Sequence, residues 1–346
     1  MTKIGIIGGG MWAKTHIKCI REEGRGEVAW VCDAAEKVAR DVQKEFGVPR
    51  VSTRHGDLLA DPAVEGVIVA TPTFTHPALA LDVLRAGKHL LLEKPMAMNA
   101  ADAAALDAEA ARRPSQIALE ASCRFTRVEP KFAFVRDLVA SGRLGEVYHV
   151  DFRDLKTTTY IEYNPSAAGW AGRRATAGGG PTFDWGEYDL SFLLGVLGDT
   201  PQLKSLHGFV RRVARSPQAT GGPDSDVEQH GVALLDFGGG LTIHYERGGG
   251  AYGDQPGRVR IHGTRGGLEL SYYPWDEAAV TLFREDASGR IVAESLPVPV
   301  ARRFENANTP VVAHFVDCIR GLAAPSMPFA LARKHLDIVL RLSAVA

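Results

Sequence analysis

The sequence contains few cysteines and no long hydrophobic run. Its four cysteines, Cys19, Cys32, Cys123 and Cys318, lie too far apart for a C-x-x-C zinc or redox motif. We therefore expect reduced thiols in a cytoplasmic protein. No apolar segment approaches the roughly 20 residues of a membrane span, and Ile4–Ile7 is too short for the apolar part of a signal peptide. The sequence thus predicts neither a membrane contact nor a leader.

The sequence also lacks an excess of positively or negatively charged residues. Forty Lys and Arg face 41 Asp and Glu, which gives a net charge of −1. This balance disfavours a nucleic-acid partner bound mainly through phosphates. The 11 histidines include no H-x-x-x-H pair, and His230, His244 and His262 fall on separate predicted strands, so we expect no metal.

The chain length of 346 residues suggests two domains, and the hydrophobic pattern changes once along it. Over residues 1–123, short β-branched runs alternate with helical patterns, which predicts an α/β Rossmann domain with a doubly wound parallel sheet. Over residues 124–346, eight predicted strands with hairpin-length connections indicate an antiparallel or mixed sheet in an α+β domain. The turn-rich segment Ser216–Asp226 is predicted to be a mobile loop.

A glycine-rich turn follows the first predicted strand. Gly8, Gly10 and Ala13 form a G-x-G-x-x-A pattern that also includes Met11 and Trp12. Gly8 permits a tight turn, Gly10 lets the backbone approach a pyrophosphate, and the small Ala13 lets the helix pack on the strand. The pattern is weak alone, but its place between a strand and a helix predicts dinucleotide binding.

Asp33 follows the second predicted strand, at the position where an acidic residue binds the adenosine ribose. A carboxylate there would repel a 2′-phosphate, and no arginine immediately follows, so NAD is favoured over NADP. Asp is also a common N-cap, and Asp33 could cap a helix starting at Ala34. Both roles are compatible, and we favour the ribose role.

Several further motifs resemble those of the glucose–fructose oxidoreductase, inositol dehydrogenase and rhizopine-catabolism family (Gfo/Idh/MocA). The resemblance covers nearly the whole chain, and its motifs are Gly8–His16, Ala70-Thr71-Pro72 with His76, Ala86–His89 leading to Glu93-Lys94-Pro95, Arg124-Phe125 with Pro130, and Gly178–Asp184. It implies an N-terminal Rossmann domain and a C-terminal domain with a largely antiparallel open sheet that binds substrate and forms a homodimer or homotetramer. It also implies that Thr71, Pro72, His76, Glu93, Lys94 and Arg124 belong to the cofactor site.

Lys94 follows a strand at the edge where open parallel sheets bind ligands. A lysine there can bind the substrate hydroxyl and the nicotinamide ribose, and its charge can lower the pKa of a neighbouring acid. From the residues alone, a solvated lysine paired with Glu93 is the more common situation, and the family pattern favours catalysis. Arg124 similarly faces the nicotinamide or forms a surface ion pair.

Asp184 and Tyr188 are spaced i, i+4 on a predicted helix, which places them on one face. Many relatives carry histidine where this chain has Tyr188, and some use tyrosine. A phenol has a reference pKa of about 10 against about 6.5 for imidazole, so it needs a neighbouring cation to act as a base. Ordinary packing of Tyr188 beside Phe192 is the alternative. The glycines Gly178–Gly180 would allow close approach to a ligand.

The stretch from Thr157 to Pro181 lacks periodicity and is rich in aromatic and cationic residues, namely Tyr160, Tyr163, Trp170, Arg173 and Arg174. Long loops of this kind are usually functional or disordered. Tyr160, Trp170, Arg173 and Arg174 are therefore candidate substrate contacts, with an oligomer contact as an equal alternative.

These observations together predict an oxidoreductase that moves a hydride between NAD and a secondary hydroxyl of a sugar, inositol or related cyclic polyol. Lys94 would orient the oxygen, Tyr188 would take its proton, and Asp184 would position substrate hydroxyls or support Tyr188. Three alternatives remain open. One is an NAD-dependent glycosidase that uses its cofactor without net redox change, and the second is a non-catalytic sugar or dinucleotide sensor. The third is a structural or assembly subunit, which the glycine turn disfavours.

Overall fold

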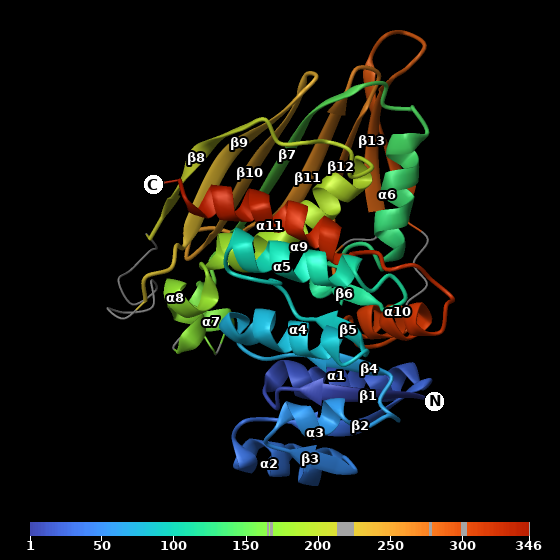
Figure 1. The fold of residues 1–346 in the computed structure, drawn as a ribbon. Coiled ribbons are helices and arrows are strands. Elements are labelled where there is room, and N and C mark those ends of the chain that lie inside the picture. Colours follow the sequence, from blue (N-terminus) through green and yellow to red (C-terminus); the bar gives the residue numbers. More distant parts are fainter. Residues whose placement is uncertain (165, 167–168, 213–224, 277–278, 299–302, 346) are drawn as a thin grey trace. The chain divides into compact units, whose positions relative to one another are not determined.

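The computed structural model describes residues 1–164, 166, 169–212, 225–276, 279–298 and 303–345, and their elements are labelled in Figure 1. The segment predicted to be a mobile loop, Ser216–Asp226, falls mostly outside these residues. The chain divides into two compact units: Met1–Arg124 with Arg302–Leu336, and Phe125–Ala301 with Asp337–Ala346. The sequence predicts a single boundary after residue 123, whereas in the structure Arg302–Leu336 groups with the first unit.

The first unit contains a six-stranded parallel sheet in the order β3-β2-β1-β4-β5-β6. Its strands are β1 (Thr2–Ile7), β2 (Gly26–Cys32), β3 (Arg50–Ser52), β4 (Gly66–Val69), β5 (His89–Leu92) and β6 (Ala118–Glu120). The order reverses between β1 and β4, which is where doubly wound sheets bind their ligands. The predicted Rossmann fold is therefore confirmed.

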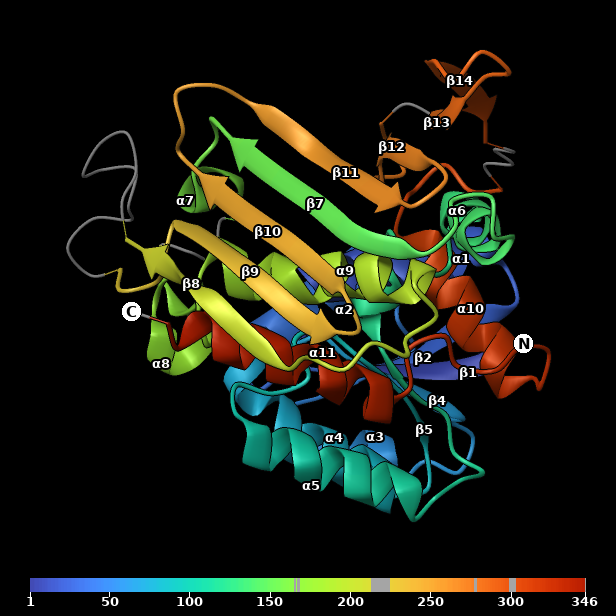
Figure 2. The same ribbon diagram turned by 90° about the horizontal axis from the view of Figure 1, so that it is seen from above.

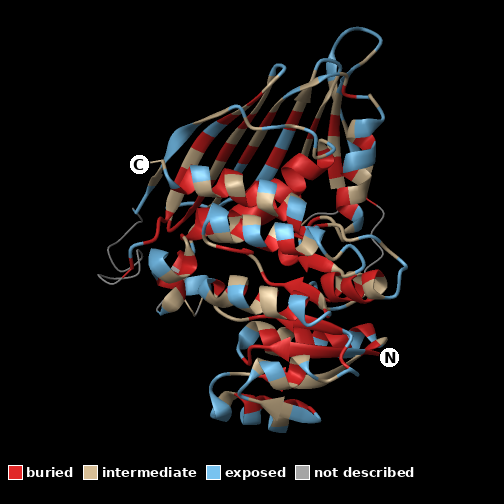
Figure 3. Cartoon of the chain, in the orientation of Figure 1, coloured by how far each residue is buried: buried red, intermediate tan, exposed pale blue. Residues whose placement is uncertain are grey.

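Helices connect these strands, as right-handed crossovers between parallel strands require. They are α1 (Met11–Glu23), α2 (Glu36–Phe46), α3 (His55–Leu59), α4 (His76–Arg85) and α5 (Ala100–Ala111). A further helix of this unit, α10 (Thr309–Ile319), comes from a later part of the chain and packs against α1. Gly24 and Gly47 end α1 and α2 in the left-handed conformation. The Asn99 side chain caps α5 by accepting the Asp102 amide. Strands β1 and β4 are almost wholly buried (Figure 3), as a sheet covered on both faces requires.

The second unit contains an eight-stranded sheet in the order β14-β13-β12-β11-β7-β10-β9-β8. Its strands are β7 (Val147–Lys156), β8 (Ser205–Arg211), β9 (His230–Gly238), β10 (Leu241–Gly249), β11 (Gln255–Gly263), β12 (Gly267–Ser271), β13 (Ala279–Glu285) and β14 (Ile291–Pro297). Every neighbouring pair is antiparallel except β7 with β10. The predicted largely antiparallel sheet is thus confirmed, with one parallel pair at its centre.

Side chains alternate between the two faces of this sheet. On β7, Val150, Phe152 and Asp154 are buried, while Arg153 between them is exposed. Helix α9 (Pro181–Val196) lies along the buried face, and in Figure 2 no helix of the described residues covers the opposite face of the strands β8, β9, β10, β7 and β11. The remaining helices are α6 (Pro130–Ala140), α7 (Tyr160–Tyr163), α8 (Arg174–Ala177) and α11 (Phe329–Ser343). Among the described residues, no helix is long and apolar enough to cross a membrane.

Candidate functional site

The predicted cofactor residues follow the carboxyl ends of the parallel strands in the first unit. Gly8, Gly10, Met11 and Trp12 follow β1, Asp33 follows β2, Thr71, Pro72 and His76 follow β4, Glu93 and Lys94 follow β5, and Arg124 follows β6 and a 3₁₀ turn. Because the strands are parallel, these ends share one edge of the sheet, which is the ligand-binding edge of this fold.

Each glycine of the turn after β1 has a different constraint. Gly8 has φ +107°, and a Cβ there would lie 2.4 Å from the carbonyl oxygen of Ala70. A Cβ on Gly10 would meet nothing within 4 Å, and Gly10 precedes α1 without any side-chain cap. No side chain of the N-cap residue therefore occupies this helix N-terminus, which suits a bound pyrophosphate. The residues present fit a dinucleotide.

Asp33 fixes the glycine turn through its carboxylate. Its Oδ2 accepts the amide of Gly9 at 2.8 Å, and its Oδ1 accepts the amide of Ala35 at 2.9 Å. Helix α2 begins only at Glu36, so Asp33 caps the turn before the helix rather than a helix starting at Ala34. Each oxygen accepts one of these two hydrogen bonds and keeps a lone pair for a ribose hydroxyl.

His76 links the two loops that follow β4 and β5. Its ring is buried, with Nδ1 2.8 Å from the carbonyl oxygen of Pro95 and Nε2 2.9 Å from that of Thr71. Burial lowers the pKa of His76, and the charge of Lys94 adds to this effect. The structure therefore gives His76 a positioning role, while its direct contact with cofactor stays a prediction.

Glu93 and Arg124 form a fully buried ion pair. Glu93 also lies 2.7 Å from Nε2 of His16, and the Arg124 guanidinium stacks 4.4 Å from the ring centroid of Trp12. Although burial opposes ionisation, the charge of Arg124 and the hydrogen bond from His16 hold the pKa of Glu93 below its usual range. The alternative of a surface ion pair for Arg124 is therefore wrong. Trp12 and Glu93 belong to the same packed network.

Lys94 directly follows this network. It is half-buried, and the peptide bond that joins it to Pro95 is cis. Glu93 pairs with Arg124 and lies beside His16, and the catalytic role of Lys94 stays a prediction.

In the second unit, Glu228 caps the N-terminus of α9. Its carboxylate accepts the amides of Gly180 at 2.8 Å, Thr182 at 3.1 Å and Phe183 at 3.2 Å. A Cβ on Gly180 would lie 2.0 Å from the Glu228 carbonyl oxygen, and Cβ atoms on Gly178 and Gly179 would strike Phe183. Packing within the protein therefore requires these glycines, and their close approach to a ligand stays a prediction.

Asp184 and Tyr188 occupy the first two turns of α9. Asp184 is half-buried, and Tyr188 is 2% exposed. Burial and the neighbouring Asp184 carboxylate raise the pKa of Tyr160 well above its ordinary value. The Tyr188 ring packs 5.3 Å from Trp185 and 5.5 Å from Phe125, centroid to centroid.

A buried ionic cluster, which the sequence did not predict, fixes α9 on the sheet. Asp189 accepts hydrogen bonds from Nε and Nη2 of Arg247 at 2.7 and 2.6 Å, and from the phenols of Tyr245 and Tyr272 at 2.8 and 2.6 Å. Asp154 accepts Nη1 of Arg247 at 2.7 Å. Removing one partner of such a buried pair typically costs about 3–5 kcal/mol. The residue next to Tyr188 is thus firmly anchored.

A cavity of about 270 Å³ lies beside this cluster, entirely within the second unit. Its walls carry four aromatic side chains, namely Tyr163, Trp185, Tyr273 and Trp275, and three charged ones, namely Asp154, Lys156 and Arg247. The rings of Tyr273 and Trp275 stack 4.9 Å apart at 11°. Trp185 also contacts Tyr188, so the aromatic wall continues to the candidate phenol. The combination of apolar walls with a few polar groups is typical of a small-molecule site.

The predicted substrate contacts lie elsewhere. Tyr160 is buried against Val227. Trp170 begins a 3₁₀ turn, and its own carbonyl oxygen accepts a hydrogen bond from the Thr176 hydroxyl. The remaining two are Arg173, which is exposed, and Arg174, which donates to the Ser343 carbonyl and lies 3.7 Å from Glu228. None of these four lines the described cavity, and their contact with substrate stays a prediction. From the stretch between Thr157 and Pro181, the lining residues are Thr158, Tyr163 and Pro181.

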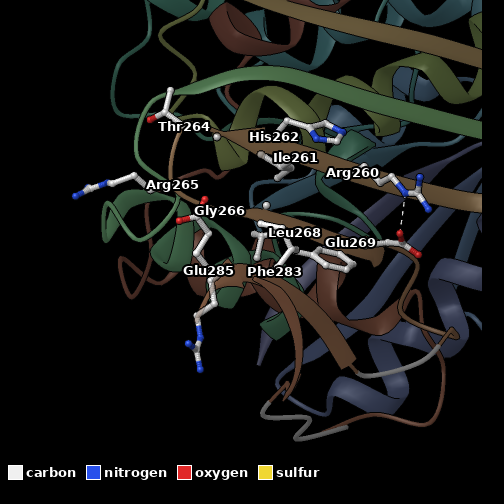
Figure 4. Close-up of a pocket in the computed structure, with 14 residues that line it drawn as sticks. Arg260, Ile261, His262, Thr264, Arg265, Gly266, Leu268, Glu269, Phe283 and Glu285 are labelled. Carbon is white, nitrogen blue, oxygen red and sulfur yellow. Dashed lines mark hydrogen bonds and ion pairs between the residues drawn. The ribbon is translucent and has the colours of Figure 1, made fainter. Parts of the chain in front are cut away.

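A larger cavity of about 690 Å³ opens elsewhere in the second unit, at the turn between β11 and β12 (Figure 4). Arg260, His262, Glu269 and Phe283 line it, and Arg260 is paired with Glu269 at 2.7 Å. It holds none of the predicted site residues. On other strands of the same sheet, His230 lies 2.9 Å from Glu246, and His244 lies 2.6 Å from Asp151. Among the described residues, no group of three or more His, Cys, Asp or Glu side chains is arranged to hold a metal ion.

Comparison with known proteins identifies the family to which the chain belongs. Residues 2–120 match the oxidoreductase family with an NAD-binding Rossmann fold, and residues 132–269 match the GFO/IDH/MocA C-terminal domain. The chain belongs to the Gfo/Idh/MocA oxidoreductase family. Residues 2–120 form the NAD-binding Rossmann domain of that family, and the protein is an oxidoreductase.

Relatives in this family act on sugars and other cyclic compounds. The chain is 28% identical over 332 residues to 1,5-anhydro-D-fructose reductase of Ensifer adhaerens, covering 94% of this chain and 90% of that protein. It is 22% identical to levoglucosan dehydrogenase of Pseudarthrobacter phenanthrenivorans, covering 83% and 78%. A levoglucosan dehydrogenase structure in complex with NADH and levoglucosan superposes with a TM-score of 0.83 at 19% identity, covering 99% of this chain and 97% of that one.

Proposed function

We propose that the protein is an NAD-dependent dehydrogenase that oxidises a secondary hydroxyl of a sugar, inositol or related cyclic polyol. The observation that carries this proposal is the aromatic cavity of the second unit, whose Trp185 contacts both the cavity and Tyr188. A pocket with aromatic walls and a few charged groups suits a polyol ring, which presents apolar C–H faces and polar hydroxyl edges.

Cofactor binding follows from the first unit. The open helix N-terminus at Gly10 would hold the pyrophosphate, and Asp33 would bind the adenosine ribose. When bound, the nicotinamide supplies a hydride acceptor, which no side chain can provide.

The side chains supply geometry and proton transfer. Lys94 polarises and orients the substrate hydroxyl oxygen through its ammonium group. Tyr188 takes the proton from that hydroxyl, and Asp184, one turn earlier on α9, positions neighbouring hydroxyls or supports the phenol. The Asp189 cluster holds this face of α9 at a fixed register on the sheet.

The test is an NADH-absorbance screen over monosaccharides, inositols and anhydrosugars. We expect NADH to accumulate with at least one cyclic polyol. Tight NAD binding with no turnover on any of them would instead favour a sensor, and release of an aglycone without NADH would favour a redox-neutral glycosidase.

Asp33 should set the preference for NAD over NADP. In Asp33→Asn the charge that repels a 2′-phosphate is lost, so we expect the ratio of kcat/KM for NAD to that for NADP to fall by at least about tenfold. The matched control is Asp41→Asn, an exposed carboxylate on α2 paired with Lys37. An unchanged ratio in Asp33→Asn would show that the carboxylate serves only the turn around Gly9.

The uncovered face of the eight-stranded sheet is the proposed oligomer contact. It carries exposed apolar side chains on β8 and β9, namely Phe209 at 38% and Leu234 at 47% exposure. Exposed apolar patches on a soluble protein commonly mark an interaction site. This supports a homodimer or homotetramer formed through the sheet.

Leu234→Lys tests that contact. A lysine on this face would place two like charges together in a symmetric interface, so we expect a shift to monomer in size-exclusion chromatography with light scattering. Leu322→Lys, at an exposed leucine of the first unit, is the control. An unaltered mass for Leu234→Lys would contradict the sheet interface.

A further inference from the structure

The cavity of the second unit contains cations that are already neutralised. Arg247 directs Nε and Nη2 to Asp189 and Nη1 to Asp154, so all three guanidinium nitrogens are engaged. Lys156 places Nζ 3.1 Å from Asp154. Two cations therefore face two carboxylates, and the charges in the cluster sum to zero. An anionic ligand would have to compete with buried carboxylates that already bind both cations.

The aromatic walls disfavour an anion in a second way. Tyr273 and Trp275 are stacked, and Trp185 meets Tyr273 edge-on at 5.9 Å. The faces of aromatic rings carry negative electrostatic potential, which attracts cations and repels anions. Lys156 shows this preference, because its Nζ lies 5.6 Å from the Tyr273 ring centroid.

The size of the cavity also favours a small uncharged ring as its ligand. Its volume of about 270 Å³ lies at the lower end of the roughly 300–1,000 Å³ of small-molecule sites. It suits one polyol ring and is small for a sugar nucleotide.

We propose that this cavity selects an uncharged cyclic polyol and rejects the phosphorylated or carboxylated forms of the same ring. The inference rests on the proposed function, since it assigns the substrate class of the same enzyme. Relatives of this chain include an enzyme named for an uncharged ring, levoglucosan dehydrogenase, and one named for a phosphorylated ring, glucose-6-phosphate 3-dehydrogenase. The selection therefore concerns this chain's own residues, above all Asp154, Lys156 and Arg247.

Binding to the full-length protein tests the proposal without requiring turnover. Trp185 and Trp275 line the cavity, so their fluorescence reports occupancy. The probes are D-glucose with D-glucose 6-phosphate and D-glucuronate, and myo-inositol with its monophosphate. We expect D-glucose to bind at least about tenfold more tightly than its 6-phosphate and D-glucuronate, or myo-inositol to bind at least about tenfold more tightly than its monophosphate. Equal or tighter binding of an anionic form, or no fluorescence change with any ring, would overturn the proposal.

Two variants test whether the charged residues of the cavity determine the preference for a neutral ring. Asp154→Asn removes one neutralising carboxylate, so its preference for the neutral ring should shrink by at least about threefold. Lys156→Gln removes a cation, so its preference should grow. If Asp154→Asn does not fold, Lys156→Gln and the unmodified protein still decide the outcome. A protein that binds neutral rings selectively but never reduces NAD would contradict the proposed function and leave this selection intact.

Discussion

Lys94→Ala should lower kcat by roughly 100- to 1,000-fold, the effect of removing one preorganised electrostatic group from an active site. Lys94 comes shortly after β5 at the carboxyl edge of the parallel sheet, and its chain neighbour Glu93 is paired with Arg124 in the interior. The Glu93–Arg124 pair fixes the backbone next to Lys94. We expect the variant to fold, and to bind NAD through Gly10 and Asp33, while hydride transfer becomes slow.

The measurement is kcat from steady-state kinetics together with the NAD dissociation constant from titration. Lys37→Ala is the control, because Lys37 is 87% exposed and pairs with Asp41 on the surface of α2. Retained kcat in Lys94→Ala would refute the catalytic assignment. A loss of NAD binding of the same size as the loss of kcat would make Lys94 a cofactor-binding residue only.

Tyr188→Phe should lower kcat by roughly 10²–10⁴-fold, the usual contribution of a general base. Phenylalanine preserves the ring that packs against Phe125 and Trp185, and removes only the hydroxyl. A phenol acts as a base in its ionised form, so oxidation by the unmodified enzyme should accelerate toward alkaline pH. The variant should lose this rise along with its activity.

Tyr148→Phe is the control, since Tyr148 is 47% exposed at the start of β7. The rate should be measured from about pH 6 to about pH 10 under conditions where chemistry limits turnover. A flat profile in the unmodified enzyme, or full activity in Tyr188→Phe, would remove Tyr188 from the mechanism.

Local patterns were enough to predict most of the fold. The strand before Gly8, the helix stop at Gly47 and the alternating runs of the second half each depend on near neighbours in the sequence. The short β3 and α3, which lie between Gly47 and β4, carry too few residues for a periodic signal. The parallel pairing of β7 with β10 joins strands about 90 residues apart, and the register of such a pair is set by the completed sheet.

Parts of the candidate site that lie close together in the sequence were predicted, whereas parts that join distant residues were not. The motifs around Gly8, Asp33 and Lys94 are contiguous, whereas the Asp189–Arg247 pair joins residues 58 positions apart. One signal was present in the sequence: Arg247 continues the buried phase of β10 after Ile243 and Tyr245. A charged residue at a buried strand position requires a buried partner.

The aromatic cavity was missed because its walls come from four separate segments. Trp185, Tyr273 and Trp275 read as ordinary core or surface residues until α9 and the strands are assembled. The long stretch from Thr157 to Pro181 was the more visible candidate. Its Arg174 is instead engaged with Ser343 and Glu228.

Isotope transfer tests the central claim most directly. A cyclic polyol from the NADH screen is prepared with deuterium on the carbon that bears the reacting hydroxyl, and the cofactor is analysed by mass spectrometry after turnover. We predict that NADH accumulates carrying one deuterium per turnover. Unlabelled NADH, or product formed while no reduced cofactor accumulates, would contradict hydride transfer from a secondary alcohol as the reaction of this protein.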